Sequence, residues 1–170
     1  VDELLRFRAE MGQEAVSLLL VGDGPDHKRL ESVAAGLGLT APDVVFAGMV
    51  PAEQVAEWYQ LGDVFVSAST SETQGLTYAE ALAAGVPVLC RADPCLLGGV
   101  RDGENGWQYH DEEDFRQKLN GFLSKPHQWE ALRRCARETG EEYSAQRFAE
   151  RVEAIYFEQA ERNALRRIPA

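Results

Sequence analysis

Residues 63–90 read DVFVSASTSETQGLTYAEALAAGVPVLC, and their pattern of apolar and polar residues indicates the class of fold. The apolar run 63–67 predicts a strand, and the small, apolar residues of 76–84 predict a helix. A second apolar run at 87–90 predicts another strand. A strand, a helix and a strand joined by short loops form a right-handed βαβ unit, in which the two strands are parallel. The stretch therefore predicts an α/β fold built on a parallel sheet.

The same alternation continues on both sides of this stretch. The strands read as continuous apolar runs, which is typical of strands buried on both faces of a parallel sheet. We therefore predict a Rossmann-like, doubly wound parallel sheet followed by C-terminal helices. The further predicted strands are 16–21, 44–47 and 106–109, and the further predicted helices are 2–11, 26–37, 51–61, 111–124, 126–139 and 144–162.

The length of 170 residues suits one domain with a full core. The predicted helix 2–11 lacks the strand that normally precedes such a helix, and the chain does not begin with methionine. We therefore expect a domain over 1–162 that is truncated at its N-terminus, with a tail at 163–170.

Charge and cysteine content narrow the classes of function. A net charge of −11 repels phosphate backbones, so nucleic acid is not expected as a partner. A small phosphorylated ligand is compatible with this charge, because helix N-termini bind phosphate through backbone N–H groups. Three cysteines form no paired framework, which favours a reducing, cytoplasmic compartment, and no zinc-ligand spacing is present. No apolar run approaches the roughly 20 residues of a membrane span.

Ligands of parallel sheets bind beyond the carboxyl ends of the strands, where three loops qualify. The first, Gly22–Pro25, lacks the third glycine of a dinucleotide fingerprint. It is interpreted as a tight turn in which Asp23 caps the next helix. The other two loops are 48–51 and 69–76.

The loop 69–76 leads into a helix whose start can hold a diphosphate. Gly75 carries no Cβ, so a ligand can approach its backbone. The N–H groups of Gly75, Leu76 and Thr77 lie at the helix start, where they have no intrahelical acceptor. A diphosphate there would accept from them and meet the positive end of the helix dipole.

Two glutamates, Glu72 and Glu80, flank this helix start with seven residues between them. Eight positions along a helix return to nearly the same face, so both carboxylates can face one groove and accept from hydroxyl groups. The alternative for Glu72 is an ordinary acid near a helix start. Glu80 precedes the close-packed run 81–85, where a charge is costly unless it is paired.

The motif Glu72-x7-Glu80 within 71–88 resembles the signature of retaining GT-B glycosyltransferases of family 4, the glycosyl transferases group 1. The likeness covers about residues 16–160. Four further segments match the order found in that family: LLVGDGP at 19–25, VFAG at 45–48, DVFVS at 63–67 and DGENG at 102–106.

This resemblance implies a role for each motif residue. The donor sugar would contact Glu72, Thr73, Gln74 and Gly75, and the diphosphate would contact Gly75, Leu76 and Thr77. Glu80 would hold the ribose diol, and the backbone of Gly48, Met49 and Val50 would read the base. Such enzymes need no cofactor or catalytic metal, because the helix dipole and basic residues stabilise the leaving diphosphate.

The resemblance also implies a function. The chain matches the C-terminal, donor-binding domain of an enzyme that transfers a hexose with retention from a nucleotide-diphosphate sugar. The family's diphosphate-binding Arg and Lys and its N-terminal acceptor domain are not in this chain. We therefore expect it to bind a nucleotide sugar without turnover on its own. The parent protein would be the glycosyltransferase.

The segment SETQGLTY at 71–78 resembles the corresponding segment of bacterial glucosyltransferases that act on diacylglycerol. It implies UDP-glucose as the donor and a membrane lipid as the acceptor. The parent protein is then expected in the cytoplasm, with peripheral association at the inner face of the membrane.

Four other interpretations share the predicted architecture. A phosphorylatable receiver module needs clustered acids at strand ends, which Asp23 and Asp63 do not supply. A dehydrogenase needs the glycine fingerprint and an acid on the second strand, which ends instead in Phe46-Ala47-Gly48. A non-catalytic nucleotide-binding or regulatory module and a sugar-nucleotide epimerase domain stay open, since fold alone does not separate them.

Overall fold

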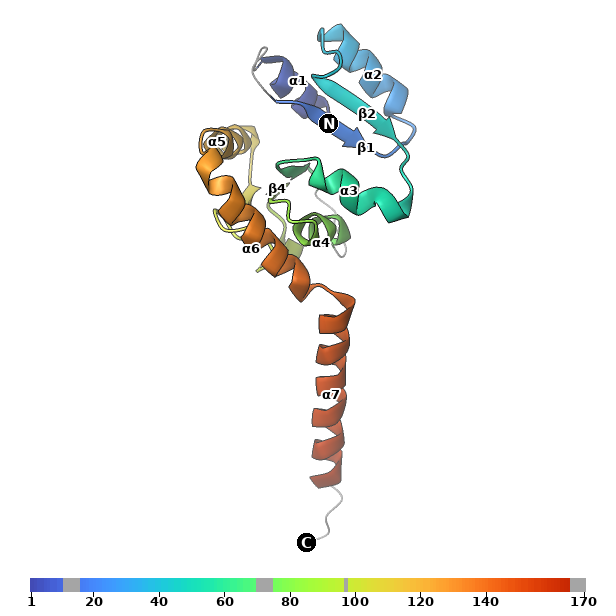
Figure 1. Cartoon of the computed structure of the whole chain (residues 1–170), viewed down its shortest axis with the longest axis vertical. Helices are drawn as coiled ribbons and strands as arrows, with labels where there is room; N and C mark the ends of the chain where they lie inside the picture. Colours follow the sequence, from blue (N-terminus) through green and yellow to red (C-terminus); the bar gives the residue numbers. More distant parts are fainter. Residues whose placement is uncertain (11–15, 70–74, 97, 166–170) are drawn as a thin grey trace. The chain divides into compact units, whose positions relative to one another are not determined.

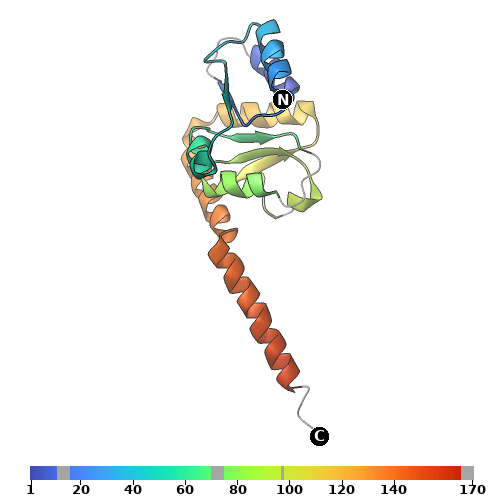
Figure 2. The same cartoon turned by 90° about the vertical axis from the view of Figure 1, so that its right-hand side faces the viewer.

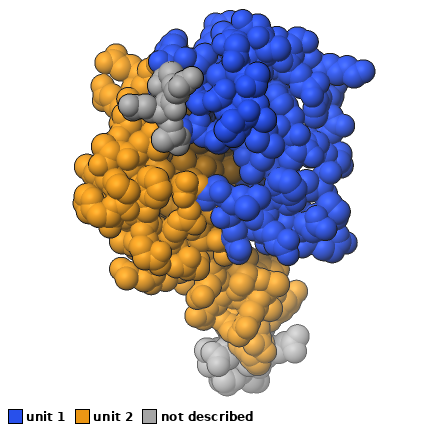
Figure 3. Space-filling model, turned by 45° about the horizontal axis from the view of Figure 1, so that its top comes forward, with its two compact units in different colours: residues 1–62 blue, residues 63–170 orange. Residues whose placement is uncertain are grey.

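The computed structural model describes residues 1–10, 16–69, 75–96 and 98–165. It divides into two compact units, Val1–Gly62 and Asp63–Ala170, which Figure 3 colours separately.

The first unit is a parallel pair of strands packed with helices (Figure 1). Leu18 of the first strand lies opposite Val44 of the second, and the register shifts by one residue at Val21, which lies opposite Gly48. A small core forms where apolar side chains of the first two helices meet those strands. The elements are α1 (Asp2–Glu10), β1 (Leu18–Val21), α2 (His27–Gly36), β2 (Val44–Gly48), η1 (Ala52–Gln54) and α3 (Val55–Gln60). The buried core residues are Leu5, Ala34, Leu39 and Val44.

The second unit holds a three-stranded parallel sheet in the order β3-β4-β5. Figure 2 shows α4 and α5 on opposite faces of this sheet, which is the arrangement of a doubly wound fold. The elements are β3 (Phe65–Ser67), α4 (Leu76–Ala83), β4 (Val88–Arg91), η2 (Pro94–Leu96), β5 (Gly106–Tyr109), α5 (Glu112–Leu123), η3 (Pro126–Gln128), α6 (Trp129–Glu142) and α7 (Ala145–Leu165).

The predicted parallel α/β fold with C-terminal helices is confirmed. The predicted strands and helices are present with shifts of a few residues at their ends; for example, β3 begins at Phe65 and α4 ends at Ala83. The described strands form a two-stranded and a three-stranded sheet, one in each unit.

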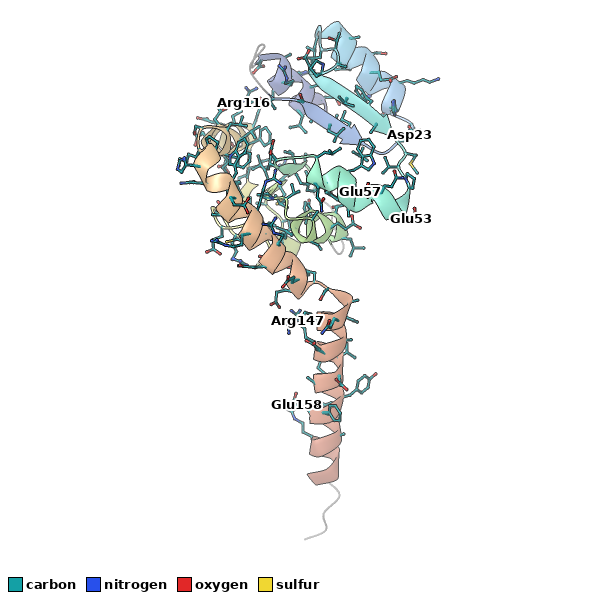
Figure 4. The ribbon with its side chains drawn as sticks, in the orientation of Figure 1. Asp23, Glu53, Glu57, Arg116, Arg147 and Glu158 are labelled. Carbon is teal, nitrogen blue, oxygen red and sulfur yellow. The ribbon has the colours of Figure 1, made fainter. Side chains whose placement is uncertain are left out.

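The C-terminal helix α7 carries apolar side chains that are exposed. Phe148, Ile155 and Tyr156 are 68%, 59% and 74% exposed. The polar side of the helix carries ion pairs within one turn, such as Arg147 with Glu150 at 3.0 Å (Arg147 is labelled in Figure 4). Surface pairs of this kind contribute little to stability.

Helix α4 packs against α6 at unusually short range. A Cβ built on Gly140 of α6 would lie 2.4 Å from the Cα and N atoms of Ala83 in α4. Backbone atoms cannot swing aside as the end of a side chain can, so only glycine fits at this point. Gly140 therefore fixes the separation of the two helices.

We expect Gly140→Ala to lower the free energy of unfolding by about 1–3 kcal/mol, the usual cost of overpacking a filled contact. The matched control is Gly121→Ala in α5, where an added Cβ would meet no atom within 4 Å. Because alanine favours the helix over glycine, this control should be neutral or stabilising by up to about 1 kcal/mol. Urea unfolding measures both variants, and equal effects would contradict the close approach of α4 to α6.

Candidate functional site

The candidate site begins where β3 ends and α4 starts. Ser67 is the last residue of β3 and Leu76 the first of α4. The predicted sugar ligands Glu72, Thr73 and Gln74 lie outside the described residues, so their roles stay predictions.

Gly75 stands at the N-cap of α4 in the left-handed conformation, with φ 61° and ψ 32°. Its carbonyl accepts from the N–H groups of Tyr78 and Ala79 at 3.1 and 3.2 Å, which starts the helix. A Cβ at this position would lie 3.1 Å from Cδ2 of Tyr78 and 3.4 Å from Cδ2 of Leu96. The structure thus adds two local reasons for glycine to the one inferred from sequence: the positive φ and the aromatic ring packed against it.

The first two residues of α4 are exposed, whereas the N-cap residue Gly75 is buried. Leu76 is 61% exposed and Thr77 is also exposed. N–H groups in the first turn have no intrahelical acceptor, and the first turn of α4 contains no acidic side chain that would offset the dipole. The arrangement favours an anion at this end of the helix.

Glu80 lies one turn further along α4 and is exposed. The helix buries Tyr78, Ala81 and Leu82 instead. The expectation that Glu80 sits in close-packed surroundings is therefore wrong, because positions 78, 81 and 82 share a different face. Residues three and four apart share a helix face, so Glu80 lies on the same exposed side as Leu76 and Thr77. An exposed side chain on this side of the helix can meet a ligand that also reaches the first turn.

The residues predicted to read the base lie in the first unit. Gly48 is the last residue of β2, and Met49 and Val50 follow it. Gly48 has a φ of 67°, and its carbonyl accepts from the N–H of Gly22 at 2.8 Å. This bond ties the turns that follow β1 and β2 to each other. Met49 is 76% exposed and Val50 is half-buried, so the backbone of this segment lies close to solvent.

The predicted helix cap by Asp23 is wrong. The N-cap of α2 is Asp26, and it makes no side-chain cap bond. Oδ1 of Asp23 instead accepts from the N–H of Gly24 at 2.7 Å and lies 3.1 Å from Nδ1 of His27 (Asp23 is labelled in Figure 4). The aspartate therefore stabilises the turn itself, which sequence reasoning had placed correctly.

A cavity of about 500 Å³ lies in the second unit beyond the ends of β4 and β5. Sequence reasoning did not find it, because its residues come from separate segments. Its polar groups bond to one another: Nζ of Lys118 lies 3.1 Å from Asp102 and 3.3 Å from Asp114. Although partial desolvation opposes the shift, the N–H of His110 and the ammonium of Lys118 lower the pKa of Asp114. The lining residues are Ala92, Asp93, Pro94, Asp102, Gln108, His110 and Lys118.

The described ranges contain no group of three or more His, Cys, Asp or Glu side chains that could hold a metal ion. None of the helices in these ranges is both long enough and apolar enough to cross a membrane.

Comparison with known proteins gives matches of sequence and of fold. The family described as Glycosyl transferases group 1 matches residues 1–125. An alpha-monoglucosyldiacylglycerol synthase of Streptococcus pneumoniae is 36% identical over 147 residues, which cover 86% of this chain and 32% of that protein. The enzyme of the same name from Acholeplasma laidlawii is 32% identical over 145 residues, 85% of this chain and 36% of that protein. The chain thus spans about a third of the length of each relative.

A solved structure gives the matching fold. Sucrose-phosphate synthase from Thermosynechococcus elongatus superposes with a TM-score of 0.78 at 26% identity, over 93% of this chain and 41% of that one.

The contact between Gly75 and the Tyr78 ring can be tested by adding one methyl group. We expect Gly75→Ala to lower the free energy of unfolding by about 2–3 kcal/mol, through the positive φ and the crowding by Tyr78 and Leu96. The control is Gly103→Ala, at a φ of 77° with no atom within 4 Å of the added Cβ. It should lose only about 1–2 kcal/mol, the cost of the left-handed conformation. Equal losses in urea unfolding would show that Tyr78 does not press on Gly75.

Proposed function

The chain belongs to the glycosyl transferases group 1 family, and we propose that it is the part of a retaining hexosyltransferase that binds the nucleotide-sugar donor. The observation that carries this proposal is the start of α4. There a buried glycine caps the helix, and the exposed residues Leu76, Thr77 and Glu80 lie on one side of it.

The leaving group of this reaction is a nucleoside diphosphate, whose negative charge grows as the bond to the sugar breaks. The N–H groups of Gly75, Leu76 and Thr77 donate to the diphosphate, and the helix dipole stabilises the developing charge. Backbone donors are fixed before the reaction, so they need no reorganisation while the charge develops. No metal ion or cofactor is required in this mechanism.

The other parts of the donor are assigned to the remaining predicted site residues. The carboxylate of Glu80 accepts from the ribose hydroxyls, since ionised carboxylates are acceptors only. The backbone of Gly48–Val50 reads the base. Glu72, with Thr73 and Gln74, accepts from and orients the hydroxyls of the sugar.

The donor and acceptor classes follow from the relatives. Two of them are named alpha-monoglucosyldiacylglycerol synthase, at 36% and 32% identity. Their names support transfer of glucose by the whole protein to a membrane lipid such as diacylglycerol, and we infer UDP-glucose as the donor. The acceptor is bound by an N-terminal domain, and the whole protein works at the inner face of the membrane as a peripheral protein.

We infer that the chain itself binds the donor without transferring the sugar; in support of this, it spans about a third of the length of relatives that are named as synthases. Incubation with UDP-glucose and diacylglycerol vesicles should give no glucolipid above background. Efficient transfer by this chain alone would contradict the assignment of the acceptor to another domain.

Calorimetric titration with UDP, GDP and ADP tests the donor assignment. We expect UDP to bind at least about tenfold more tightly than GDP or ADP, the ratio that 1.4 kcal/mol of base recognition produces. UDP-glucose should bind more tightly than UDP, because the sugar adds hydroxyl contacts. Equal affinity for the three diphosphates would contradict recognition of the base by Gly48–Val50, and binding of none would contradict the proposed function.

We expect Glu80→Gln to weaken binding of UDP about tenfold, because it replaces charge-assisted hydrogen bonds to the ribose. Glu72→Gln should weaken UDP-glucose but leave UDP unchanged. The matched control is Glu153→Gln on α7, an exposed glutamate that undergoes the same loss of charge. If Glu72→Gln weakened UDP and Glu80→Gln did not, the two assignments would have to be exchanged.

A further inference from the structure

Three hydrogen bonds meet at Ser67, the last residue of β3. The hydroxyl of Tyr78 in α4 donates to Oγ of Ser67 at 3.0 Å. The hydroxyl of Tyr109 in β5 donates to the backbone carbonyl of Ser67 at 3.2 Å. The N–H of Ser69 donates to the same Oγ at 3.3 Å. The carboxyl end of β3 is thus hydrogen-bonded to α4 and to β5. In the sheet, β3 pairs with β4 and not with β5.

Both tyrosines are held firmly within the second unit. Tyr78 is 2% exposed, and its ring meets Phe65 of β3 edge-on, with the ring centres 6.0 Å apart. Tyr109 is 7% exposed and meets Phe115 of α5 in the same way at 5.1 Å. Because their rings are packed, the two hydroxyl groups have little freedom to move away from Ser67.

The Tyr78 ring also packs against Gly75. Its Cδ2 atom lies within contact distance of the position that a Cβ on Gly75 would occupy. The backbone N–H of Tyr78 donates to the Gly75 carbonyl at 3.1 Å. One residue therefore touches both the end of β3 and the residue at which α4 begins.

We propose that Tyr78 and Tyr109 are positioning residues, which hold Ser67 and Gly75 in register and so fix the direction of the first-turn N–H groups of α4. We call Ser67, Tyr78 and Tyr109 the tyrosine anchor. The functional part of this inference rests on the proposed function, in which those N–H groups bind the diphosphate of the donor.

The hydroxyl groups, rather than the rings alone, carry this role. Phenylalanine would fill the same space at either position, so packing does not require tyrosine. A buried hydroxyl is costly unless it is bonded, and each of these two hydroxyls is bonded to Ser67. Removing the oxygen of Tyr78 keeps the ring under Gly75 but disconnects it from β3.

The ligand-free test is amide hydrogen exchange in Tyr78→Phe. We expect the amide of Ala79, which donates to the Gly75 carbonyl at 3.2 Å, to exchange about fivefold faster, as loss of one buried hydrogen bond predicts. The amide of Val88, which donates to Asn105 at 3.1 Å, should be unchanged. Equal acceleration of both amides would mean that the hydroxyl stabilises the unit as a whole, and no acceleration would mean that it has no role. Either result would overturn the proposal.

The bond partners provide two further variants. Ser67→Ala should accelerate the Ala79 amide as Tyr78→Phe does, and Tyr78→Phe should add little in the double variant, because both changes remove the same bond between Tyr78 and Ser67. Ser67→Ala also removes the bond from the N–H of Ser69. Tyr109→Phe should act in the same direction through the Ser67 carbonyl. Tyr156→Phe on α7 is the control, since this tyrosine is 74% exposed. Additive effects of Ser67→Ala and Tyr78→Phe would contradict the tyrosine anchor.

Binding measurements connect the tyrosine anchor to the ligand. We expect Tyr78→Phe to weaken UDP about three- to fivefold and to leave uridine, which lacks the diphosphate, unchanged. Equal weakening of both would contradict positioning of the first turn. If the unaltered chain bound no UDP, the proposed function would fail, and the hydrogen-exchange result would still decide whether the tyrosine anchor positions α4.

Discussion

Parallel pairing of β3 with β4 is the constraint on which the candidate site depends. Parallel neighbours cannot be joined by a tight turn, so the chain must cross over from the carboxyl end of one strand to the amino end of the next. In this protein the crossover is α4, and its N-terminus therefore lies on the side of the sheet where β3 ends. Gly75 makes the turn into the helix with a positive φ. Glycine is the residue type that adopts this conformation without steric strain.

Packing converts this topological requirement into a defined geometry. Gly140 lets α6 approach the backbone of α4 at one end, and the Tyr78 ring fills the space between Gly75 and β3 at the other. Helix α4 is thus held from two sides, while Leu76 and Thr77 of its first turn are exposed. Backbone N–H groups bind an anion without any positive side chain, which explains how a chain of net charge −11 can present a phosphate site.

Much of this was predictable from sequence, because strands and helices have distinct periodicities and the motif at Glu72 and Glu80 is specific. Side-chain direction was less predictable. Glu80 was placed in a close-packed segment, whereas the buried face of α4 passes through Tyr78, Ala81 and Leu82. The bonds from Tyr78 and Tyr109 to Ser67 span 11 and 42 residues. No local pattern encodes such contacts, since they arise only when the sheet has assembled.

Binding of the nucleotide-sugar diphosphate by the first turn of α4 can be measured through the backbone amide resonances of the ¹⁵N-labelled chain during titration with UDP. We expect saturable shifts at Gly75, Leu76 and Thr77 that exceed those of amides in α7, and no such shifts with uridine. Saturation by UDP without shifts at these three amides, or with shifts centred on His110 and Lys118 at the cavity, would contradict it.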